Sequence, residues 1–453
     1  MADHDTIVAL ATASGSGAIA VIRLSGPEAI SLVNRIFKGK DLTAQATHTV
    51  HFGTIRDGKE IIDEVLVTLF IAPHSYTKEH VVEVSTHNSR YVVERIIQLL
   101  IRNGARAARP GEFTLRAFLN GQMDLSQAEA VADLIASTSA ASHQVAMQQM
   151  RGGFSNVLKQ LREQLIQFAS LVELELDFSE EDVEFANRVQ LEQLIWEIQG
   201  VVRKLIASFE QGNVLKNGVP VVIAGRPNVG KSTLLNTLLN EERAIVSDIA
   251  GTTRDTIEDE VNINGVTFRF IDTAGIRDTG DVIEAKGVER TREKMKKSRL
   301  IVYMADPQQD DPEEINRQLG EVTQLGVPYV TVVNKVDLLT QDGLDRLRPL
   351  DPIFISAKNN VGVEELKAEL LQKVDLHNLD AADVLVTNIR HVEALHKTDE
   401  ALQRVIHGIH GGITSDFLAM DIRQALHHLG EITGSVSTDD LLDNIFSKFC
   451  IGK

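Results

Sequence analysis

Four short motifs follow one another in this chain of 453 residues, and each has a pattern suited to nucleotide chemistry. They are Gly225-Arg-Pro-Asn-Val-Gly-Lys-Ser232, Asp272-Thr-Ala-Gly275, Asn334-Lys-Val-Asp337 and Ser356-Ala-Lys358. A glycine-rich loop that ends in Gly-Lys-Ser allows backbone N–H groups to surround a phosphate chain. Alone, this first motif predicts only a nucleoside triphosphate site.

The third motif narrows the identity of the base. The Asp337 carboxylate can accept hydrogen bonds from N1–H and the exocyclic amine of guanine, whereas adenine has no matching pair of donors. Ala357 is expected to offer its backbone N–H to the guanine carbonyl. An isolated Asn-Lys-x-Asp is also compatible with a surface turn, but the four motifs in order, each at the end of an expected strand, predict a guanine-nucleotide site.

Several side chains have predicted roles at the phosphates. Lys231 is expected to reach the β and γ phosphates, and the Ser232 hydroxyl to coordinate magnesium. Thr253, in an expected switch loop at residues 251–255, is the second predicted magnesium ligand. Asp272 is expected to hold a magnesium-bound water.

The residue that would orient the attacking water is not obvious. The Gly275 N–H is expected to sense the γ phosphate, but the next residue is Ile276, where many GTPases place a glutamine. Glu284 lies further along the same segment and its carboxylate has the chemistry to hold the water. From the residues alone, an exposed glutamate without a catalytic role is the favoured alternative.

Asn228 in the phosphate loop has two possible roles. Its amide oxygen, placed close to the phosphates, would suit a monovalent cation that neutralises developing charge. Equally, asparagine tolerates an unusual backbone angle that a tight loop requires. The residues leave both alternatives open.

Composition limits the classes of function. The formal net charge of -18 argues against strong nucleic-acid binding by this chain alone, because phosphate contacts need lysine and arginine, which a partner would supply. The single cysteine, Cys450, rules out an internal disulfide and a cysteine-based zinc site, and it fits a reducing cytoplasm. We find neither a secretory signal nor an apolar run of about 20 residues, so no membrane contact is expected.

Alternating strands and helices are expected to position the motifs in a mainly parallel sheet covered on both faces. The expected strands lie at residues 219–224, 266–271, 300–304, 329–333 and 352–355, and the helix after the phosphate loop at 233–239. The N-terminal residues 1–118 indicate an α+β domain. Its expected strands lie at residues 8–12, 18–23, 64–70 and 81–85, with a helix at 91–102.

Helical sequence dominates residues 119–215 and returns at 380–453. Ser126 followed by Glu129 forms a capping-box pattern that predicts a helix start. Because the α/β segment 216–379 separates the two helical parts, we expect it to be an insertion and the two parts to pack as one bundle.

Further segments are spread over the full length of the chain. They are Asp5-Thr-Ile-Val-Ala9, Ala20-Val-Ile-Arg-Leu-Ser-Gly26, Arg109-Pro-Gly-Glu-Phe113, Arg116-Ala-Phe-Leu-Asn120, Asp124-Leu-Ser-Gln-Ala-Glu-Ala130, Ile249-Ala-Gly-Thr-Thr-Arg-Asp255 and Phe449-Cys-Ile-Gly-Lys453. With them, the whole chain resembles the MnmE (TrmE) family of bacterial tRNA-modification GTPases.

The resemblance implies a multidomain α/β architecture with an α+β folate-binding-like N-terminal domain that dimerises, a discontinuous helical bundle, and an inserted Ras-like P-loop GTPase domain. It implies a homodimer that works with the flavoprotein MnmG. The pair installs an aminomethyl-type (carboxymethylaminomethyl) group at carbon 5 of the wobble uridine of certain tRNAs, and most tRNA contacts are expected from the partner. The G domains are expected to dimerise in a potassium-dependent, GTP-bound state that activates hydrolysis.

The implied cofactors are GTP or GDP, magnesium, potassium and a one-carbon tetrahydrofolate derivative. The residues assigned to the nucleotide are Asn228, Val229, Gly230, Lys231, Ser232, Thr233, Ser247, Asp248, Ile249, Ala250, Gly251, Thr252, Thr253, Asp272, Thr273, Ala274, Gly275, Asn334, Lys335, Asp337, Ser356, Ala357 and Lys358. The resemblance places potassium at Asn228, Ser247, Ile249 and Thr252, and magnesium at Ser232 and Thr253. It also makes Glu284 the water-orienting catalytic residue, which reverses the preference drawn from the residues alone.

The folate derivative is assigned to Arg23, Glu83, Gln122 and Lys453, with Cys450 beside the pocket as either a reactive or an inert thiol. Three departures from the family pattern cluster near this site. Thr77-Lys-Glu-His80 replaces a usual Thr-Gly-Glu-Asp, Thr86-His-Asn-Ser89 replaces a usual Gly-His-Gly-Gly, and Gln122 stands where some relatives carry a basic residue.

Two other functions are alternatives. A ribosome-assembly GTPase shares the Gly-Arg-Pro-Asn-Val-Gly-Lys-Ser loop, but such proteins usually add a basic RNA-binding domain or a second G domain, and this sequence indicates neither. A one-carbon transferase with a regulatory G domain would transfer a group without a flavoprotein, which is not expected here.

Overall fold

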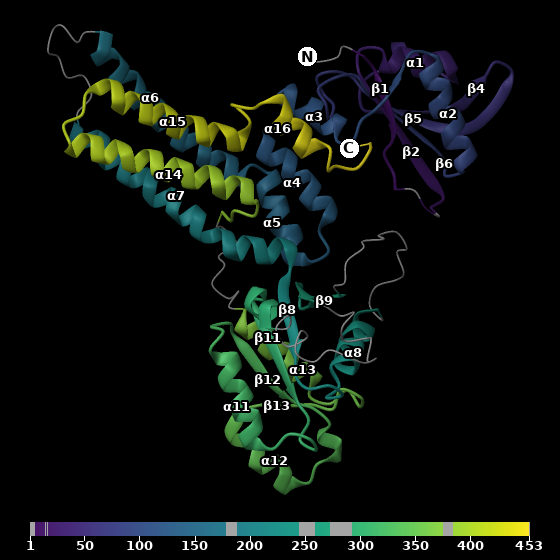
Figure 1. The fold of residues 1–453 in the computed structure, drawn as a ribbon. Helices are drawn as coiled ribbons and strands as arrows, with labels where there is room; N and C mark the ends of the chain where they lie inside the picture. The colour runs from purple at the N-terminus through teal and green to yellow at the C-terminus, as the bar shows by residue number, and fades with distance from the viewer. Residues whose placement is uncertain are drawn as a thin grey trace. The chain divides into compact units, whose positions relative to one another are not determined.

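The structure is a computed structural model that describes residues 5–13, 15, 17–177, 188–243, 259–271, 292–374 and 384–452 (Figure 1). The chain forms two compact units. Unit 1 contains Met1–Ala132, Gln149–Val202 and Glu393–Lys453, and unit 2 contains Asp133–Gln148 and Arg203–Val392. The predicted domain limits at residues 118, 215 and 379 stay a prediction. Within the described ranges, no helix has the length and apolarity that crossing a membrane requires.

The described part of unit 1 contains a seven-stranded sheet with the order β3-β4-β5-β6-β2-β1-β7. Its strands are β1 (Ile7–Leu10), β2 (Ile19–Ser25), β3 (Phe37–Lys38), β4 (Thr49–Asp57), β5 (Glu60–Phe70), β6 (Val81–His87) and β7 (Arg106–Ala107). Neighbouring strands are antiparallel except β1 and β7, which are parallel. The predicted N-terminal strands are confirmed, whereas β3, β4 and β7 were not expected from the sequence.

Helices α1 (Ala29–Ile36) and α2 (Arg90–Arg102) contribute apolar side chains to one face of this sheet. Successive strand residues point to opposite faces, so Val65 and Val67 of β5 join the core under the helices. Leu66 between them is 46% exposed on the opposite face. It pairs across the strands with Phe52 of β4, which is 67% exposed, so this second face presents apolar side chains to solvent.

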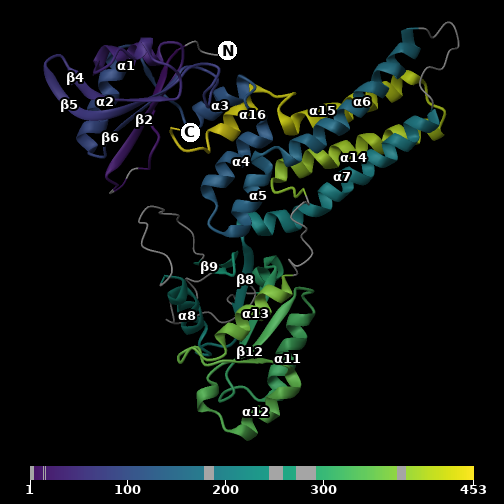
Figure 2. The same ribbon diagram turned by 180° about the vertical axis from the view of Figure 1, so that it is seen from behind.

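Helices make up the rest of unit 1 and continue into unit 2. Their bounds are α3 (Glu112–Leu119), α4 (Leu125–Ala136), α5 (Ala140–Met150), α6 (Gly153–Asp177), α7 (Arg188–Asn217), α14 (Ile389–His410), α15 (Ser415–Thr433) and α16 (Asp439–Phe446). Figures 1 and 2 both show α15 along α6 and α14 along α7.

Ion pairs and hydrogen bonds join helices that are distant in sequence. Arg423 of α15 pairs with Glu173 of α6 at 2.7 Å. The Gln199 amide of α7 donates to the Asp399 carboxylate of α14 at 3.0 Å. Helices on the two sides of the α/β segment therefore pack along each other in unit 1. The predicted insertion of the α/β segment into one bundle stays a prediction.

The predicted capping box at Ser126 and Glu129 is wrong, because the capping pair lies two residues earlier, at Asp124 and Gln127. The Asp124 carboxylate accepts the Gln127 N–H at 2.9 Å, and the Gln127 side-chain oxygen accepts the Asp124 N–H at 3.0 Å. This reciprocal pair caps α4, whose first residue is Leu125. Ser126 lies inside the first turn, where its hydroxyl donates to Asp124.

Unit 2 is an α/β unit. The described part of its sheet has six strands in the order β13-β12-β11-β8-β10-β9. The strands are β8 (Val219–Ala224), β9 (Asp259–Ile263), β10 (Val266–Phe270), β11 (Leu300–Ala305), β12 (Tyr329–Val333) and β13 (Ile353–Phe354), and the helices are α8 (Lys231–Arg243), α11 (Pro312–Thr323), α12 (Gln341–Leu347) and α13 (Val363–Lys373). All described pairings are parallel except that of β9 with β10. The edge strand β9 was not predicted.

Both faces of this sheet are buried. In β11, Leu300, Val302 and Met304 join one core cluster with residues of α8 and α13, while Ile301 and Tyr303 join another with residues of α11. This alternation explains why β11 is a continuous apolar run, because both of its faces pack against helices.

Candidate functional site

The three predicted nucleotide motifs that lie within the described residues meet at one edge of the sheet in unit 2. The strands β8, β11, β12 and β13 are parallel neighbours, so their carboxyl ends lie at the same edge. The phosphate loop follows β8, Asn334 follows β12, and Ser356 follows β13 after one residue. This edge is where a doubly wound sheet binds its ligand.

The phosphate loop has a backbone that requires its glycines. Gly225 has a φ of 140°, and a Cβ there would lie 2.2 Å from the Met304 carbonyl oxygen. A Cβ at Gly230 would lie 2.2 Å from the Asn334 amide nitrogen. Asn228 has a φ of 64°, so the expectation of an unusual backbone angle at this residue is confirmed.

Lys231 begins α8 and turns its ammonium back over the loop. Its Nζ donates to the carbonyl oxygens of Gly225 at 2.8 Å and of Arg226 at 2.7 Å. Burial lowers the pKa of the Lys231 ammonium. A cation at a helix N-terminus forms an anion site suited to phosphates.

Asn334 is buried and acts as a bridge between two loops. Its Nδ2 donates to the Val229 carbonyl at 2.8 Å, and its Oδ1 accepts the Ala357 N–H at 3.0 Å. The amide therefore ties the phosphate loop to the loop that follows β13. The direct contacts with guanine predicted for Asn334 and Ala357 stay predictions.

The Asp337 carboxylate is exposed and oriented by a neighbouring motif. The Ser356 hydroxyl donates to its Oδ1 at 2.6 Å. Thr237 of α8 donates to the Ala357 carbonyl at 2.8 Å, which anchors the same loop from the other side. The acceptor predicted for guanine is thus held by a residue of a separate motif, Ser356-Ala-Lys358.

Sequence reasoning missed the loop that follows β11. Asp306 is fully buried, and its carboxylate accepts the Lys335 ammonium at 2.6 Å. The Asp306 N–H donates to Asp310 at 3.0 Å, and Asp310 pairs with Arg226 of the phosphate loop at 3.0 Å. These contacts link the phosphate and base loops by a second route. An aspartate directly after a buried strand at this edge was the signal in the sequence.

Other predicted residues lie outside the described ranges. They are Ser247, Asp248, Ile249, Ala250, Gly251, Thr252, Thr253, Asp272, Thr273, Ala274, Gly275, Glu284 and Lys453. The predicted catalytic glutamate, the second magnesium ligand and three of the four potassium ligands are among them.

A second candidate site lies at the C-terminal tail in unit 1. Arg23 of β2 and Glu83 of β6 face each other across neighbouring strands and pair at 2.8 Å. Arg23 also donates to the Gly452 carbonyl at 3.3 Å, and its guanidinium lies 5.9 Å and 5.8 Å from the ring centres of Tyr76 and Phe113. Two predicted folate residues and the terminal motif therefore come together.

Cys450 and Gln122 are the other described residues that were predicted at the folate site. Cys450 has a free, exposed thiol. The backbone carbonyl of Cys450 accepts the Gly111 N–H at 3.4 Å. Gln122 follows α3 with an exposed side chain. The Lys78 ammonium donates at 2.7 Å to the carbonyl of the adjacent Gly121.

Residues of two of the three departures from the family pattern make hydrogen bonds to neighbouring segments. Lys78 has a φ of 58°, a conformation that favours the usual glycine, and its hydrogen bond to Gly121 holds it there. Thr86 and His87 both donate to Asp63 on the neighbouring strand. Although burial alone would raise the pKa of Asp63, these hydrogen bonds lower it.

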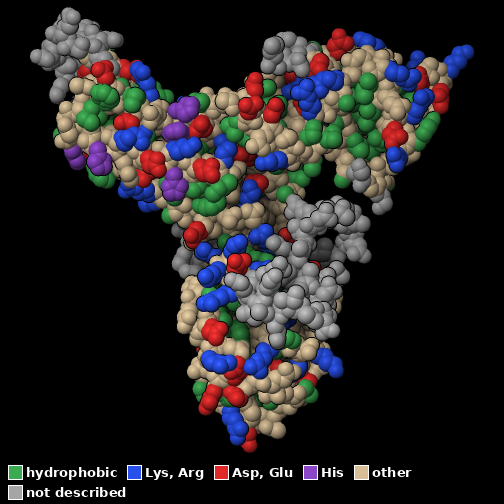
Figure 3. All heavy atoms as spheres, in the orientation of Figure 1, with side chains coloured by type: hydrophobic (Ala, Val, Ile, Leu, Met, Phe, Trp, Pro, Cys, Tyr) green, Lys and Arg blue, Asp and Glu red, His purple; other side chains and the backbone are tan. Residues whose placement is uncertain are grey.

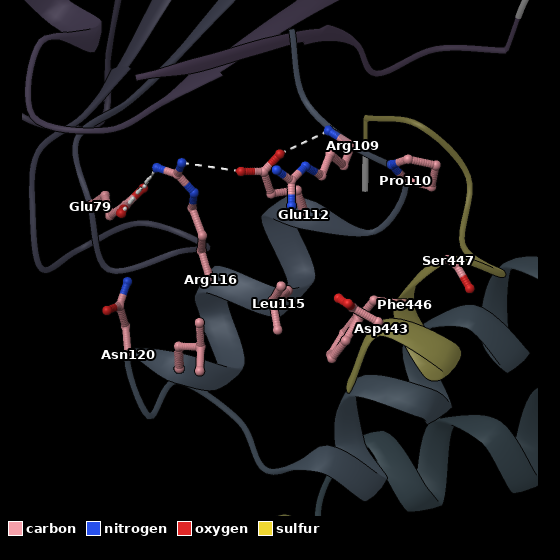
Figure 4. A pocket seen from close by; sticks show the side chains of 11 residues that line it. Glu79, Arg109, Pro110, Glu112, Leu115, Arg116, Asn120, Asp443, Phe446 and Ser447 are labelled. Carbon is pink, nitrogen blue, oxygen red and sulfur yellow. Dashed lines mark hydrogen bonds and ion pairs between the residues drawn. The ribbon is translucent and has the colours of Figure 1, made fainter. Parts of the chain in front are cut away.

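A pocket of about 370 Å³ lies between α3 and α16, on the face of α3 that carries Glu112 and Arg116 (Figure 4). The almost buried Arg116 pairs there with Glu79 at 3.2 Å and with Glu112 at 3.2 Å. Burial raises the pKa of Glu112, but hydrogen bonds from Arg106 and the Arg109 backbone outweigh it and lower the pKa. The charges that line this pocket are thus largely compensated within the protein.

The fold and the nucleotide edge define unit 2 as a P-loop domain of the guanine-nucleotide-binding class. Matches to known families cover the rest of the chain as well. Residues 6–122 match the family described as GTP-binding protein TrmE N-terminus, and residues 125–450 match the MnmE helical domain. The chain belongs to the tRNA modification GTPase MnmE family.

Relatives named tRNA modification GTPase MnmE match this chain over almost their full length. The tRNA modification GTPase MnmE of Cytophaga hutchinsonii is 60% identical over 450 residues, which cover 99% of this chain and 98% of that protein. The protein of the same name from Christiangramia forsetii is 56% identical, with 99% of each chain covered. That from Flavobacterium johnsoniae is 55% identical, with 100% of each covered.

Proposed function

We propose that this chain hydrolyses GTP as a subunit of an enzyme that modifies tRNA. The observation that carries the proposal is the bridge made by Asn334 between the phosphate loop and the base loop, in a chain that matches tRNA modification GTPases over its whole length. A bridged site holds phosphates and base in one geometry, which favours positioning of the γ phosphate.

The phosphate edge fits a nucleotide with magnesium. Lys231 is half-buried among loop carbonyls, where phosphate oxygens are better partners for its ammonium, and Ser232 follows it in the first turn of α8. We assign magnesium to Ser232 and Thr253; the ion would neutralise charge on the phosphoryl group. Lys231 binds the phosphates, and Asp337 orients the guanine.

Hydrolysis needs a group that orients water, because the Ile276 side chain offers no hydrogen bond. We assign this role to the Glu284 carboxylate. Asn228 has an exposed side chain on the phosphate loop, which fits a cation ligand. With Ser247, Ile249 and Thr252, it would hold potassium, whose charge would substitute for an arginine finger. For the other residues assigned to the nucleotide from the sequence, we propose the same contacts with GTP.

The N-terminal site fits a one-carbon tetrahydrofolate derivative. Arg23 and Glu83 present donors and an acceptor beside the rings of Tyr76 and Phe113, a combination suited to a flat heterocycle with amide and amine edges. The folate would carry the one-carbon unit. Arg23, Glu83, Gln122 and Lys453 would bind and orient it.

We further propose a homodimer that works with the flavoprotein MnmG and places the carboxymethylaminomethyl group on the wobble uridine. The open face of the N-terminal sheet supports a dimer, because Ile19, Val50, Phe52 and Leu66 are exposed on it. The net charge of -18 supports a partner that supplies most tRNA contacts.

Two measurements test this function. The purified chain is expected to hydrolyse GTP but not ATP, and faster in potassium than in sodium; equal rates in the two salts would remove the potassium assignment. Deletion of the gene is expected to remove the modified wobble uridine from tRNA hydrolysates, and restoration by the wild-type chain is the control. Unchanged nucleosides would contradict the tRNA role, and folate-dependent transfer by the isolated chain would support a one-carbon transferase instead.

A further inference from the structure

Histidine side chains gather on the visible face of the helical part of unit 1, over α14 and α15 (Figure 3). Within the described ranges, one set of three metal-ligating side chains converges: His427, His428 and Glu431 of α15. Their potential ligand atoms all lie within 4.8 Å of one another. No predicted role in nucleotide, folate or tRNA chemistry involves these residues.

The helix geometry explains this convergence. Residues three and four apart are neighbours on a helix surface, so both histidines lie one turn before Glu431 and reach it from two sides. His428 Nδ1 lies 2.9 Å from one Glu431 oxygen, and His427 Nε2 lies 3.6 Å from the other. The two rings are 5.5 Å apart between centres and nearly perpendicular, so they do not stack on each other.

One of these two separations matches the spacing of a metal coordination shell, and the other is that of a hydrogen bond. Zinc bonds of about 2.0–2.2 Å to imidazole nitrogen and carboxylate oxygen place tetrahedral ligands roughly 3.3–3.6 Å apart. The 3.6 Å separation already matches this range, and a small movement of the exposed side chains would open the 2.9 Å separation to it. Water would complete the coordination, since all protein ligands come from one helix.

The position of the cluster favours a bound cation. Glu431 lies in the last turn of α15, which contains no basic residue and ends before Gly434. A carboxylate near a helix C-terminus is electrostatically unfavourable, and a cation there is favourable. A divalent ion bound by the two imidazoles and the carboxylate would offset the negative charge of Glu431.

We propose that His427, His428 and Glu431 form a surface site for a divalent transition-metal ion, with zinc as the best match. The carboxylate is a hard ligand, but the two imidazoles are borderline ligands, so the set suits zinc better than magnesium or calcium, which take oxygen ligands. The site is separate from the nucleotide edge, so its occupancy is expected to leave nucleotide binding unchanged.

The test is titration of the metal-free, full-length chain with Zn²⁺ by calorimetry, repeated with Co²⁺ by visible absorption. The variants are His427→Ala and His428→Ala. The matched control is His407→Ala on α14, an exposed histidine whose ring hydrogen-bonds to the Gln403 carbonyl. Cys450→Ser controls for binding by the thiol. Circular dichroism and GDP affinity check that each variant folds.

One equivalent of zinc is expected to bind the wild-type chain. Each of the two test variants is expected to weaken that equivalent by about tenfold or more, since even changes to the residues that support metal ligands cost 10–100-fold. His407→Ala and Cys450→Ser are expected to bind as the wild type does. Absence of zinc binding to the wild-type chain, or unchanged affinity in either test variant, would overturn the three-ligand site.

Discussion

The Asn334 side chain donates a hydrogen bond to the Val229 carbonyl at 2.8 Å and so holds the phosphate loop against the residues that follow β12. The two residues are far apart in sequence but lie at the same edge of the sheet. Because a Cβ at Gly230 would collide with the same amide, the bridge also explains why the loop needs glycine next to Val229.

Asn334→Ala is expected to weaken both the fold and nucleotide binding. The substitution leaves the Val229 carbonyl and the Ala357 N–H without the amide, and a buried unsatisfied polar group costs about 1–3 kcal/mol. Urea unfolding and GDP titration measure the two effects. Asn359→Ala is the control, because the Asn359 side chain is exposed in the loop that follows β13. Equal stability of the two variants would refute the bridging role.

Asp306→Asn is expected to loosen the base loop without changing side-chain volume. The substitution removes the charge that accepts the Lys335 ammonium at 2.6 Å, and a hydrogen bond to a charged group contributes about 1.5–3 kcal/mol. Guanine-nucleotide affinity is expected to fall, as measured with a fluorescent GDP analogue. Asp342→Asn, an exposed aspartate of α12, is expected to retain wild-type affinity. Undiminished affinity in Asp306→Asn would show that Asp306 does not position Lys335.

The lowered pKa of Lys231 predicts a pH dependence in the nucleotide-free chain. Burial holds the folded-state pKa below the ordinary value of 10.5, so the unfolded chain binds more protons between these two values. The free energy of unfolding therefore receives a contribution that rises with pH in this window. Lys231→Met is expected to remove that contribution. Comparison of unfolding curves across the window measures it, and parallel pH profiles of the two proteins would contradict the prediction.

Glu284→Ala is expected to leave GTP binding nearly intact and to lower turnover by roughly 10²-fold or more, the scale of a positioned acid–base group. Single-turnover hydrolysis in potassium measures the effect. Asp281→Ala, in the same segment, is the control and is expected to retain activity. A turnover rate equal to that of the control would return Glu284 to the role of an ordinary surface residue.

Gly452→Ala is expected to displace the C-terminal tail. Gly452 has a φ of 94°, and a Cβ there would lie 2.2 Å from the Leu10 carbonyl oxygen. The contact between Arg23 and the tail would then be lost, and affinity for a tetrahydrofolate derivative is expected to fall. Gly412→Ala is a matched control, because Gly412 also has positive φ but its Cβ would meet nothing within 4 Å. Similar folate affinity in both variants would argue against a role for the docked tail.

Local patterns predicted much of the fold. The buried strand β8 and the phosphate loop after it were evident because an apolar run followed by Gly-Lys-Ser is specific at short range. The edge strand β9 was missed, since its residues Asp259–Ile263 are largely polar and pair only with β10. The start of α4 was misplaced because several polar residues compete to cap it, and only the geometry shows that Asp124 does so.

For the candidate sites, the sequence by itself determined which residues have groups suited to phosphate and guanine chemistry, because charge, hydrogen-bonding groups and glycine content belong to the residues. Only the tertiary structure decided that Asn334 acts as a bridge, that Asp306 holds Lys335, and that the C-terminal tail docks beside Arg23. These contacts join segments far apart in the chain, so they depend on strand order and on the directions of side chains, which local sequence patterns do not specify.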